Sequence, residues 1–457
     1  MSNTCRLRIT RDHYDLLIKH LFPGDRDEHG AVLLAGLSSV KDRPTLLVRE
    51  VHPAREGLDY VAGQIGYRAL TPSFIHRMIT RGRDEQLVYL AVHNHASDQE
   101  VGFSRIDLQS HERGYPALLQ IARGTPVGAL VFGRRSIEAD LWLPVGKRLS
   151  LDKAVVIGNS IVHLTPTPRE NAAVAMTHDR QVRMFGKAGQ TRLRECRVGV
   201  IGLGGMGSLI AEYLARLGVG HFHLVDSDSV EESNLSRIVG ASREDAVQKT
   251  AKVIVAQRLI RQANQGAEVD LIVDDVAKES VAKALTSCDY LFLAADSMRA
   301  RLVVNAMVHQ YLIPGVQVGS KIRFDPQRGL LDVMSANRRL RPGLGCLMCN
   351  QLIDATQLAK EAKTDEERRA QAYGVEEPNP SVITLNAVAA AHAVNDFLLD
   401  YLALRPENGH FYYEQFNFLK DARTLVEPRM DKDCSECSRS GLRFGRGDAV
   451  PLPCVEG

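Results

Sequence analysis

A glycine-rich turn followed by acidic and then basic polar residues is the most constraining feature of this 457-residue sequence. Residues 197–237 read RVGVIGLGGMGSLIAEYLARLGVGHFHLVDSDSVEESNLSR. Residues 198–201 predict a buried strand, and Ser208 predicts the start of a helix. Four glycines in between would let the backbone turn tightly beside phosphates, which helix N-termini attract: Gly202, Gly204, Gly205 and Gly207. The segment therefore predicts a nucleotide-binding α/β domain.

Polar residues beyond this turn decide between two kinds of nucleotide chemistry. A dinucleotide-dependent dehydrogenase is the alternative, because any such domain carries a glycine-rich turn. Asp226 ends the next expected strand and can accept hydrogen bonds from ribose hydroxyls. Asn234, Arg237 and Lys252, the last on an expected helix over 252–264, add groups that suit a triphosphate. Since cleavage at the α-phosphate develops charge that fixed cations stabilise, ATP chemistry is favoured.

Two further segments complete a family pattern. Residues 290–296, YLFLAAD, predict a buried strand that ends in a carboxylate suited to Mg²⁺, and HDRQ at 178–181 precedes the first strand. Together these motifs resemble the MoeB/ThiF/HesA family, the adenylation fold of ubiquitin-activating enzymes, over roughly residues 171–438. The resemblance implies specific roles: Asp226 as ribose ligand, Asn234, Arg237 and Lys252 as triphosphate contacts, Asp296 as magnesium ligand, and Arg180 as an arginine supplied across a homodimer interface.

The lysine of this pattern has two candidates. In the resembling family it follows an acidic-apolar-Gly tract, whereas DAVQKTAK at 245–252 lacks that glycine and also contains Lys249. We favour Lys252 because the helix after it keeps the family's spacing. A solvated helix face is the alternative for either lysine.

Two CxxC pairs use four of the eight cysteines and predict a tetrahedral thiolate site for zinc: Cys346, Cys349, Cys434 and Cys437. Members of the resembling family commonly carry such a structural zinc. Redox disulfides are the alternative. Because four thiolates leave no open coordination position, we expect a structural ion.

The other cysteines bear on whether a thioester forms. In thioester-forming relatives the nucleophile often lies in the crossover region, which corresponds here to the cysteine-free residues 354–380, an amphipathic lid or a solvated helix. Cys196 and Cys288 lie beside expected strands and predict inert core thiols. Cys454 is the one candidate acceptor, and its role stays open.

A His-x-His pair in the first third predicts a second metal site of a different kind. On an extended segment both imidazoles share one face, and a later carboxylate completes three ligands with a position left for water: His93, His95 and Asp107. Glu28, before the expected strand 31–37, would accept the proton of that water. The Ser104 hydroxyl would stabilise the oxyanion.

This arrangement resembles the JAMM/MPN (JAB1) metalloprotease family over roughly the first 150 residues. Its pattern is a distant Glu, then His-x-His, then Ser-x-x-Asp, and it implies a catalytic zinc that serves peptide or isopeptide cleavage. Two departures are Ala96 in place of the usual proline and a slightly longer His-to-Ser interval. A histidine pair on a solvated strand, with unrelated carboxylates, is the alternative.

The sequence predicts two α/β domains, with a boundary in the proline-containing segment 163–173 after an expected strand at 155–164. Residues 1–165 would form a JAMM/MPN, cytidine-deaminase-like domain, and residues 166–457 a Rossmann-like ThiF adenylation domain with the Cys₄ site. The net charge of +2 gives no argument for nucleic acid or membrane partners. No secretory leader or membrane-length apolar run is evident, so we expect a cytoplasmic protein.

The combined interpretation is a bifunctional enzyme of ubiquitin-like protein metabolism. The second domain would use Mg²⁺ and ATP to adenylate the C-terminal glycine of a ubiquitin-like or sulfur-carrier protein, and a conjugating enzyme is a possible further partner. The first domain would process or remove that modifier. Activation of a sulfur carrier or small peptide for sulfur transfer or cofactor biosynthesis is the alternative, and a non-catalytic scaffold is disfavoured by the complete ligand sets.

Overall fold

The computed structural model describes residues 3–39, 44–61, 68–169, 173–362, 380–406 and 409–455. They form two compact units. Unit 1 contains Met1–Glu170, Gln310–Leu312 and Leu442–Pro451, and unit 2 contains Asn171–His309, Ile313–Gly441 and Leu452–Gly457. Unit 1 thus includes two short stretches that the sequence-based division assigned to the second domain.

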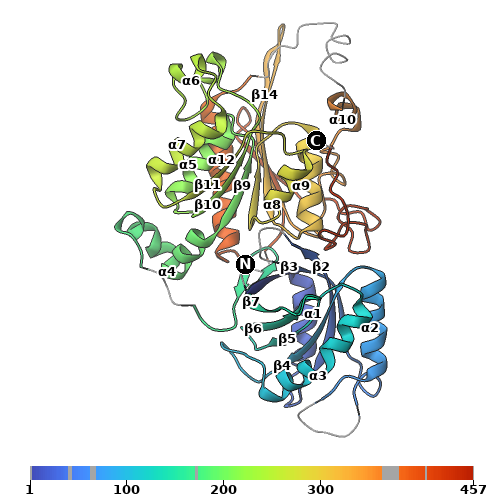
Figure 1. The fold of residues 1–457 in the computed structure, drawn as a ribbon. Coiled ribbons are helices and arrows are strands. Elements are labelled where there is room, and N and C mark those ends of the chain that lie inside the picture. Colours follow the sequence, from blue (N-terminus) through green and yellow to red (C-terminus); the bar gives the residue numbers. More distant parts are fainter. Residues whose placement is uncertain are drawn as a thin grey trace. The chain divides into compact units, whose positions relative to one another are not determined.

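Unit 1 is a mixed α/β structure built on a curled sheet (Figure 1). The strand order is β1-β3-β2-β4-β5-β6-β7-β8, and β1 also pairs in parallel with β7, so the sheet closes on itself. Its elements are β1 (Thr4–Thr10), α1 (Arg11–Leu21), β2 (Gly30–Ser38), β3 (Thr45–Pro53), α2 (Pro72–Asp84), β4 (Val88–Asn94), α3 (Arg105–Ala122), β5 (Val127–Phe132), β6 (Ile137–Trp142), β7 (Arg148–Ile157) and β8 (Ile161–Leu164).

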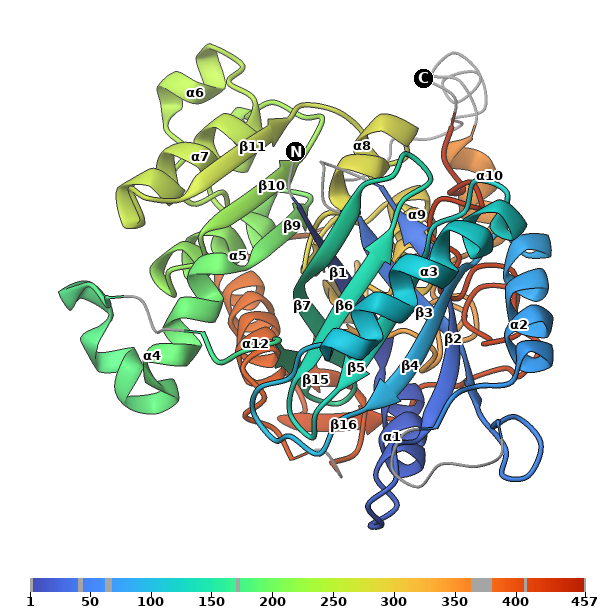
Figure 2. The same cartoon turned by 60° about the horizontal axis from the view of Figure 1, so that its bottom comes forward.

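Both faces of this sheet are buried, because helices cover each of them. Strand β2 is apolar throughout, and its alternate residues enter opposite cores. Leu33 packs in the cluster that includes Leu17 of α1, whereas Leu34 packs with Phe74 of α2 and Tyr115 of α3. Figure 2 shows α2 and α3 together in front of the strands. Two-sided burial holds β2 and β4 rigidly in the middle of unit 1.

The single strand expected over 155–164 is wrong. The chain instead folds back after β7 and returns as β8, which pairs antiparallel with it. The backbone N–H of Gly158 donates to the carbonyl of Ser160 at 3.0 Å and closes the turn. Gly-Asn-Ser is turn chemistry, and it prevails over the apolar residues on either side.

Unit 2 is a Rossmann-like α/β structure with an antiparallel extension. Its strand order is β11-β10-β9-β12-β13-β14-β15-β16, with parallel pairing from β11 to β13 and antiparallel pairing beyond. Its elements are α4 (Asp179–Glu195), β9 (Arg197–Ile201), α5 (Gly205–Arg216), β10 (His221–Val225), α6 (Arg243–Val247), α7 (Lys252–Ala263), β11 (Glu268–Ile272), α8 (Glu279–Leu285), β12 (Tyr290–Leu293), α9 (Met298–Gln310), β13 (Gly315–Asp325), β14 (Gly329–Leu340), α10 (Ala355–Glu361), α12 (Ile383–Tyr401), β15 (Tyr413–Asn417) and β16 (Ala422–Val426).

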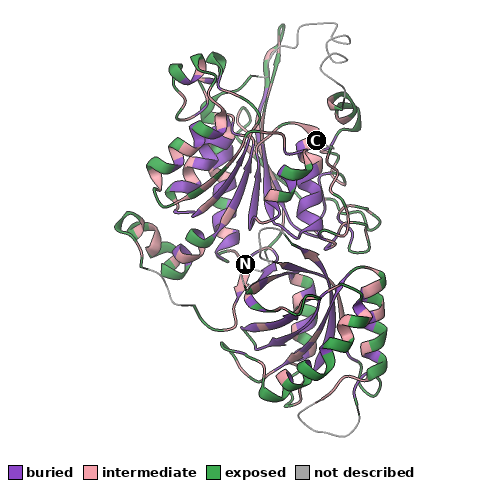
Figure 3. Cartoon of the chain, viewed as in Figure 1, coloured by how far each residue is buried: buried purple, intermediate pink, exposed green. Residues whose placement is uncertain are grey.

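Helices flank the parallel part of this sheet on both sides (Figure 1). Helices α5, α7 and α12 gather on one face, and α8 and α9 on the other. The strands between them are the most buried part of unit 2 (Figure 3). Successive helices switch faces between β9 and β12, and open α/β sheets bind ligands at the carboxyl ends of the strands at such a point.

Most elements expected in this region are confirmed, with one correction. Strand β9 and helix α7 lie where the sequence places them. Helix α5, however, begins at Gly205 and not at Ser208, with Gly204 as its N-cap. Of the crossover region, α10 is described, whereas residues 363–379 lie outside the described residues. In the part of the chain that is described, no helix is long and apolar enough to cross a membrane.

Candidate functional site

The glycine-rich turn between β9 and α5 has no room for side chains at two positions. Gly202 has a φ of +86°, and a Cβ there would lie 2.6 Å from the backbone nitrogen of Ala295. A Cβ on Gly207 would overlap the carbonyl oxygen of Gly202. Gly204 differs, since nothing lies within 4 Å of a Cβ built on it. The turn is therefore tightly packed toward the protein and open at the N-terminus of α5, where a phosphate could approach.

Asp226 lies directly against this turn. It follows β10, and its Oδ2 accepts a hydrogen bond from the backbone N–H of Leu203 at 2.6 Å. Its Oδ1 accepts from the N–H of Asp228 at 2.9 Å. Burial raises the pKa of Asp226, although the nearby Lys252 opposes this effect. The carboxylate is thus held at the carboxyl end of β10, beside the glycine turn.

The two candidate lysines occupy different environments. Lys252 is the first residue of α7, and its Nζ lies 2.7 Å from Oδ2 of Asp228 and 3.9 Å from Oδ1 of Asp226. Lys249 is exposed and has a φ of +52° in the turn before α7. Of these two lysines, Lys252 is the one that points its charge into the acidic edge of the nucleotide turn.

Asn234 is the last residue of a short 3₁₀ turn, Glu232–Asn234, and Arg237 comes three residues later. The Nη1 of Arg237 donates to the carbonyl of Ser233 at 2.7 Å, and its Cβ and Cδ lie 3.4 Å from a Cβ built on Gly205. Asn234 is buried, and its Nδ2 donates to the Ser233 hydroxyl at 3.2 Å. Arg237 thus lies against the glycine turn.

Asp296 and Arg180 are both exposed. Asp296 comes three residues after β12, at the carboxyl edge of the sheet next to Gly202. Arg180 lies in the first turn of α4, a helix interrupted at Gly186, whose φ is +75°. The role expected for Arg180 at a partner's nucleotide stays a prediction.

One polar residue at the turn was not predicted from the sequence. Asn386 on α12 is buried, and its Nδ2 is in close contact with the position that a Cβ on Gly205 would take. Its Oδ1 accepts from the hydroxyl of Ser320 on β13 at 3.2 Å, and its Nδ2 donates to Ser381 at 3.0 Å. Asn386 therefore links the glycine turn, at Gly205, to Ser320 on β13. Its signal in the sequence is an amide in the first, mostly apolar half of the helix, ITLNAVAAA.

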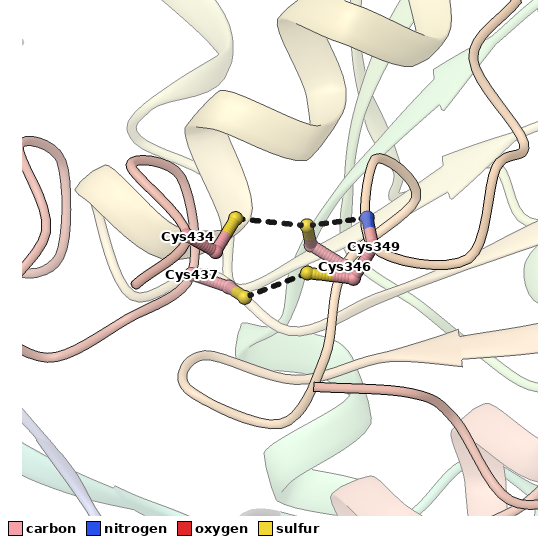
Figure 4. A group of neighbouring side chains, drawn as sticks. All are labelled: Cys346, Cys349, Cys434 and Cys437. Atoms are coloured by element: carbon pink, nitrogen blue, oxygen red, sulfur yellow. Dashed lines mark hydrogen bonds between the residues drawn. The ribbon is translucent and has the colours of Figure 1, made fainter. Parts of the chain in front are cut away.

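The four CxxC cysteines form one cluster (Figure 4). All four Sγ atoms lie within 4.8 Å of one another, with 3.7 Å between Cys346 and Cys434 and 3.6 Å between Cys349 and Cys437. A tetrahedron with Zn–S bonds of about 2.3 Å has sulfurs about 3.8 Å apart, so the cluster fits zinc. Hydrogen bonding with Cys437 lowers the pKa of the Cys346 thiol, which favours a thiolate there.

The remaining thiols differ in exposure. Cys196 and Cys288 are fully buried, as expected for core thiols. Cys5 is also buried, and burial raises the pKa of its thiol to about 12. Cys454 is partly exposed. Its candidate role as a thioester acceptor stays a prediction.

In unit 1, the two histidines and the aspartate converge as expected. His93 lies near the end of β4, His95 follows that strand, and Asp107 lies in the first turn of α3. The Oδ2 of Asp107 lies 3.5 Å from Nε2 of each histidine, and the three ligand atoms form a group that could hold a metal ion. Burial raises the pKa of Asp107, but hydrogen bonding to both histidines outweighs it and leaves the carboxyl ionised.

Glu28 and Ser104 lie at this group. Oε1 of Glu28 is 3.8 Å from Nε2 of His95, and burial raises the pKa of Glu28. Ser104 is the N-cap of α3: its Oγ accepts from the N–H of Asp107 at 3.2 Å, and its own N–H donates to Asp107 Oδ2 at 2.8 Å. This capping box orients the carboxylate and leaves the proton of the hydroxyl available for donation.

Comparisons with known proteins concern mainly unit 2. A profile of the ThiF family matches residues 178–436. The chain is 36% identical over 139 residues to the sulfur carrier protein ThiS adenylyltransferase of Bacillus subtilis (strain 168), covering 30% of this chain and 41% of that protein. It is 34% identical over 142 residues to the SAMP-activating enzyme E1 of Haloferax volcanii, covering 31% and 52%.

A third similar protein has a name of a different kind. The tRNA threonylcarbamoyladenosine dehydratase of Escherichia coli (strain K12) is 33% identical over 138 residues, covering 30% of this chain and 51% of that protein. The chain thus spans about half or less of these three relatives. Among solved structures, E. coli MccB with ATP has a TM-score of 0.46 and 20% identity, covering 59% of this chain and 76% of that one. Because the family profile spans more than half of the sequence, the chain belongs to the ThiF family.

Proposed function

We propose that unit 2 adenylates a carboxylate at the expense of ATP. The observation that carries this proposal is the convergence of Asp226, Lys252 and Arg237 on the glycine turn. The ribose would bind Asp226, and the phosphates would lie over the N-terminus of α5. A carboxylate oxygen attacks the α-phosphorus, the bond to the bridging β-phosphate oxygen breaks, and pyrophosphate leaves. Lys252 and Arg237 stabilise the charge that develops.

The acid that we propose is the C-terminal glycine of a ubiquitin-like or sulfur-carrier protein. Two of the similar proteins are named for such partners, a sulfur carrier and a SAMP. Activation of a sulfur carrier or small peptide for sulfur transfer or cofactor biosynthesis is the second candidate, which relatives named as an adenylyltransferase and sulfurtransferase and as a molybdopterin-synthase adenylyltransferase support. Asp296 lies where it could hold the Mg²⁺ of the nucleotide.

Unit 1, we propose, is a zinc peptidase that cleaves after the terminal glycine of the same modifier. His93, His95 and Asp107 supply three ligands and leave a position open. A zinc ion held there would polarise the scissile carbonyl and acidify water. Glu28, whose pKa burial raises, would accept the proton and pass it to the leaving amine, and the Ser104 hydroxyl would donate to the oxyanion.

The two activities together support modifier processing. Cleavage would expose the terminal glycine of a precursor for activation, or release a modifier already attached to a target. The exposed Arg180 on the kinked helix α4 supports a homodimer in which this arginine reaches the partner's nucleotide. A conjugating enzyme would take the activated modifier if the product is a conjugate.

The test separates the two units. ATP–pyrophosphate exchange with a glycine-terminated ubiquitin-fold protein measures adenylation, and cleavage of a C-terminal extension from that protein measures the peptidase. Asp296→Ala should abolish exchange and spare cleavage, whereas Glu28→Ala should abolish cleavage and spare exchange. Full exchange in Asp296→Ala would refute the ATP site. Intact cleavage in Glu28→Ala would mean that unit 1 is a binding module with a peptidase's ligands.

A further inference from the structure

Two arginines on unit 2 lack the carboxylate partners that enclosed guanidinium groups normally have. Arg301 lies on α9 and Arg338 on β14, and both are only partly accessible. Within the described residues, neither forms an ion pair within 4.0 Å. Removal of a charge from water is costly unless a partner compensates it. Burial accordingly lowers the pKa of both arginines, and the charge of Arg301 lowers that of Arg338 further.

The neighbouring arginines at the end of the same strand have internal partners. Arg339 and Arg341 face the other side of the sheet, where Asp400 of α12 pairs with both. These two buried arginines therefore have a buried carboxylate as partner. The unmatched charge of Arg301 and Arg338 is therefore specific to the α9 side of β14.

Arg338 lies at the edge of the sheet where the nucleotide turn is found. Its Nη1 donates to Oε1 of Gln317 on β13 at 2.6 Å. Gln317 pairs in register with Leu293, the last residue of β12, from which the chain continues to Asp296. Arg338 is therefore bonded to the strand next to β12, at the level where β12 ends and the chain continues to the magnesium candidate.

Further donors surround the same place. The Nη1 of Arg301 donates to the carbonyl of Leu352 at 2.9 Å, but no described residue accepts a hydrogen bond from its buried Nε. The buried hydroxyl of Tyr413, opposite Arg338 on β15, likewise has no hydrogen-bond partner among the residues that the structure describes. Glu361 does not neutralise the pair directly, because its carboxylate accepts the backbone N–H groups of Met298 and Arg299 at the start of α9. The charges of Asp296 and Glu361 raise the pKa of Arg301 and partly oppose the effect of burial, but among the described residues neither carboxylate forms an ion pair with it.

We propose that Arg301 and Arg338 form a receptor for the terminal carboxylate of the acid to be adenylated, with Tyr413 as an additional donor. The inference rests on the proposed function and specifies what the site recognises: a free C-terminal carboxylate. Two guanidinium groups match the two oxygens of a carboxylate, and charge-assisted hydrogen bonds of this kind are strong. Pyrophosphate from ATP is a second anion with the same chemistry, and the experiment distinguishes the two.

Binding of matched peptides to the full-length protein tests this receptor without any reaction. One peptide of about ten residues ends in Gly-Gly with a free carboxylate, and the other ends in the corresponding amide. The wild type should bind the acid about 10 to 100 times more tightly than the amide. Arg338→Met and Arg301→Met should each remove most of that preference, and Arg338→Lys should keep part of it, because charge remains but the fork geometry is lost.

Arg328→Met is the matched control, since Arg328 lies in the exposed turn between β13 and β14 and its loss changes the net charge equally. It should bind both peptides as the wild type does. Equal binding of acid and amide by the wild type, or an equal loss of preference in Arg328→Met, would overturn the receptor. The receptor would also be overturned if Arg338→Met weakened the binding of ATP or pyrophosphate but kept the preference for the acid peptide. Unchanged zinc content shows that a variant is folded.

The proposed function can fail separately from this inference. If no pyrophosphate exchange occurs with any glycine-terminated protein but the arginine-dependent acid preference persists, unit 2 binds the carboxylate without activating it. If exchange occurs and the preference is absent, adenylation stands and the receptor is wrong.

Discussion

The ammonium of Lys252 and the carboxylate of Asp228 meet at 2.7 Å at the carboxyl edge of the parallel strands. This ion pair holds the lysine beside the half-buried Asp226, which accepts a hydrogen bond from the turn that begins at Gly202. Lys252→Met should lower the rate of ATP–pyrophosphate exchange about 100-fold, because one fixed cation near the developing charge is lost. Lys249→Met is the control and should stay close to wild type, since Lys249 is exposed. The reverse pattern would transfer the role to Lys249.

Alanine substitutions at two glycines of the nucleotide turn should impair different properties, one stability and the other ATP binding. Gly207→Ala places a Cβ against the carbonyl of Gly202 and should lower the melting temperature of unit 2, because the backbone on both sides must move. Gly204→Ala meets no protein atom within 4 Å and should fold normally, yet it should weaken ATP binding, since its Cβ projects where phosphate approaches. Thermal unfolding and nucleotide titration measure the two effects. If folded Gly204→Ala binds ATP with normal affinity, the phosphates do not lie at the N-terminus of α5.

Mixing two inactive variants tests the proposed homodimer. If Arg180 acts on the partner's nucleotide, Arg180→Ala and Lys252→Met disable different parts of each composite site. Random exchange of subunits then produces heterodimers with one intact site, so an equal mixture should recover about a quarter of wild-type exchange activity. No recovery after confirmed subunit exchange would mean that Arg180 acts within its own chain, and wild-type activity of Arg180→Ala alone would mean that it has no role.

The two metal groups should behave as different kinds of site. Cys434→Ser removes one of four thiolates from a closed site, so it should lower stability and soluble yield while folded molecules keep both activities. Replacing His93 and His95 by alanine should leave folding intact and abolish cleavage. Metal analysis should find about two zinc ions per wild-type chain and about one in the double variant. An unchanged zinc content in that variant would contradict a metal site on His93 and His95.

The nucleotide turn was predictable because its parts are close in sequence. The glycines, Asp226, Arg237 and Lys252 come from one β-α-β segment and the helix after it, whose backbone geometry follows from local rules. The start of α5 was misplaced for a local reason as well: serine is a common N-cap, whereas the actual cap, Gly204, has no side chain to indicate it.

Residues brought together by packing could not be predicted in this way. Asn386 meets Ser320 only because α12 packs on β13, and nothing in either segment indicates the partner. Likewise, Arg338 and Arg339 are adjacent in sequence, yet the alternation of side chains along β14 sends one toward Gln317 and the other toward Asp400. Only the three-dimensional structure distinguishes Arg339, which pairs with a carboxylate, from Arg338, which bonds to an amide.

A buried polar network behind the metal group of unit 1 gives a prediction about acid stability. Asp140 on β6 accepts hydrogen bonds from His111 Nδ1 at 2.8 Å, from Trp142 Nε1 at 3.0 Å and from Arg148. Burial raises the pKa of Asp140, but these hydrogen bonds outweigh it and lower the pKa to about 2. An unfolded aspartate has a pKa of about 3.9. The carboxylate therefore stabilises unit 1 above about pH 4, and this stability is lost as the pH falls toward 2.

Trp142 is the sole tryptophan of the chain, so its fluorescence reports the unfolding of unit 1. Asp140→Asn should lower the free energy of unfolding by about 1 kcal/mol at pH 7, and the difference from wild type should shrink as the pH falls from about 4 to about 2. Urea titrations that follow this fluorescence at several pH values measure the effect. Asp98→Asn, at an exposed position, should match the wild type throughout. A difference between Asp140→Asn and wild type that is the same at pH 2 and pH 7 would show that the charge of Asp140 does not contribute, and that the amide merely disrupts packing around His111.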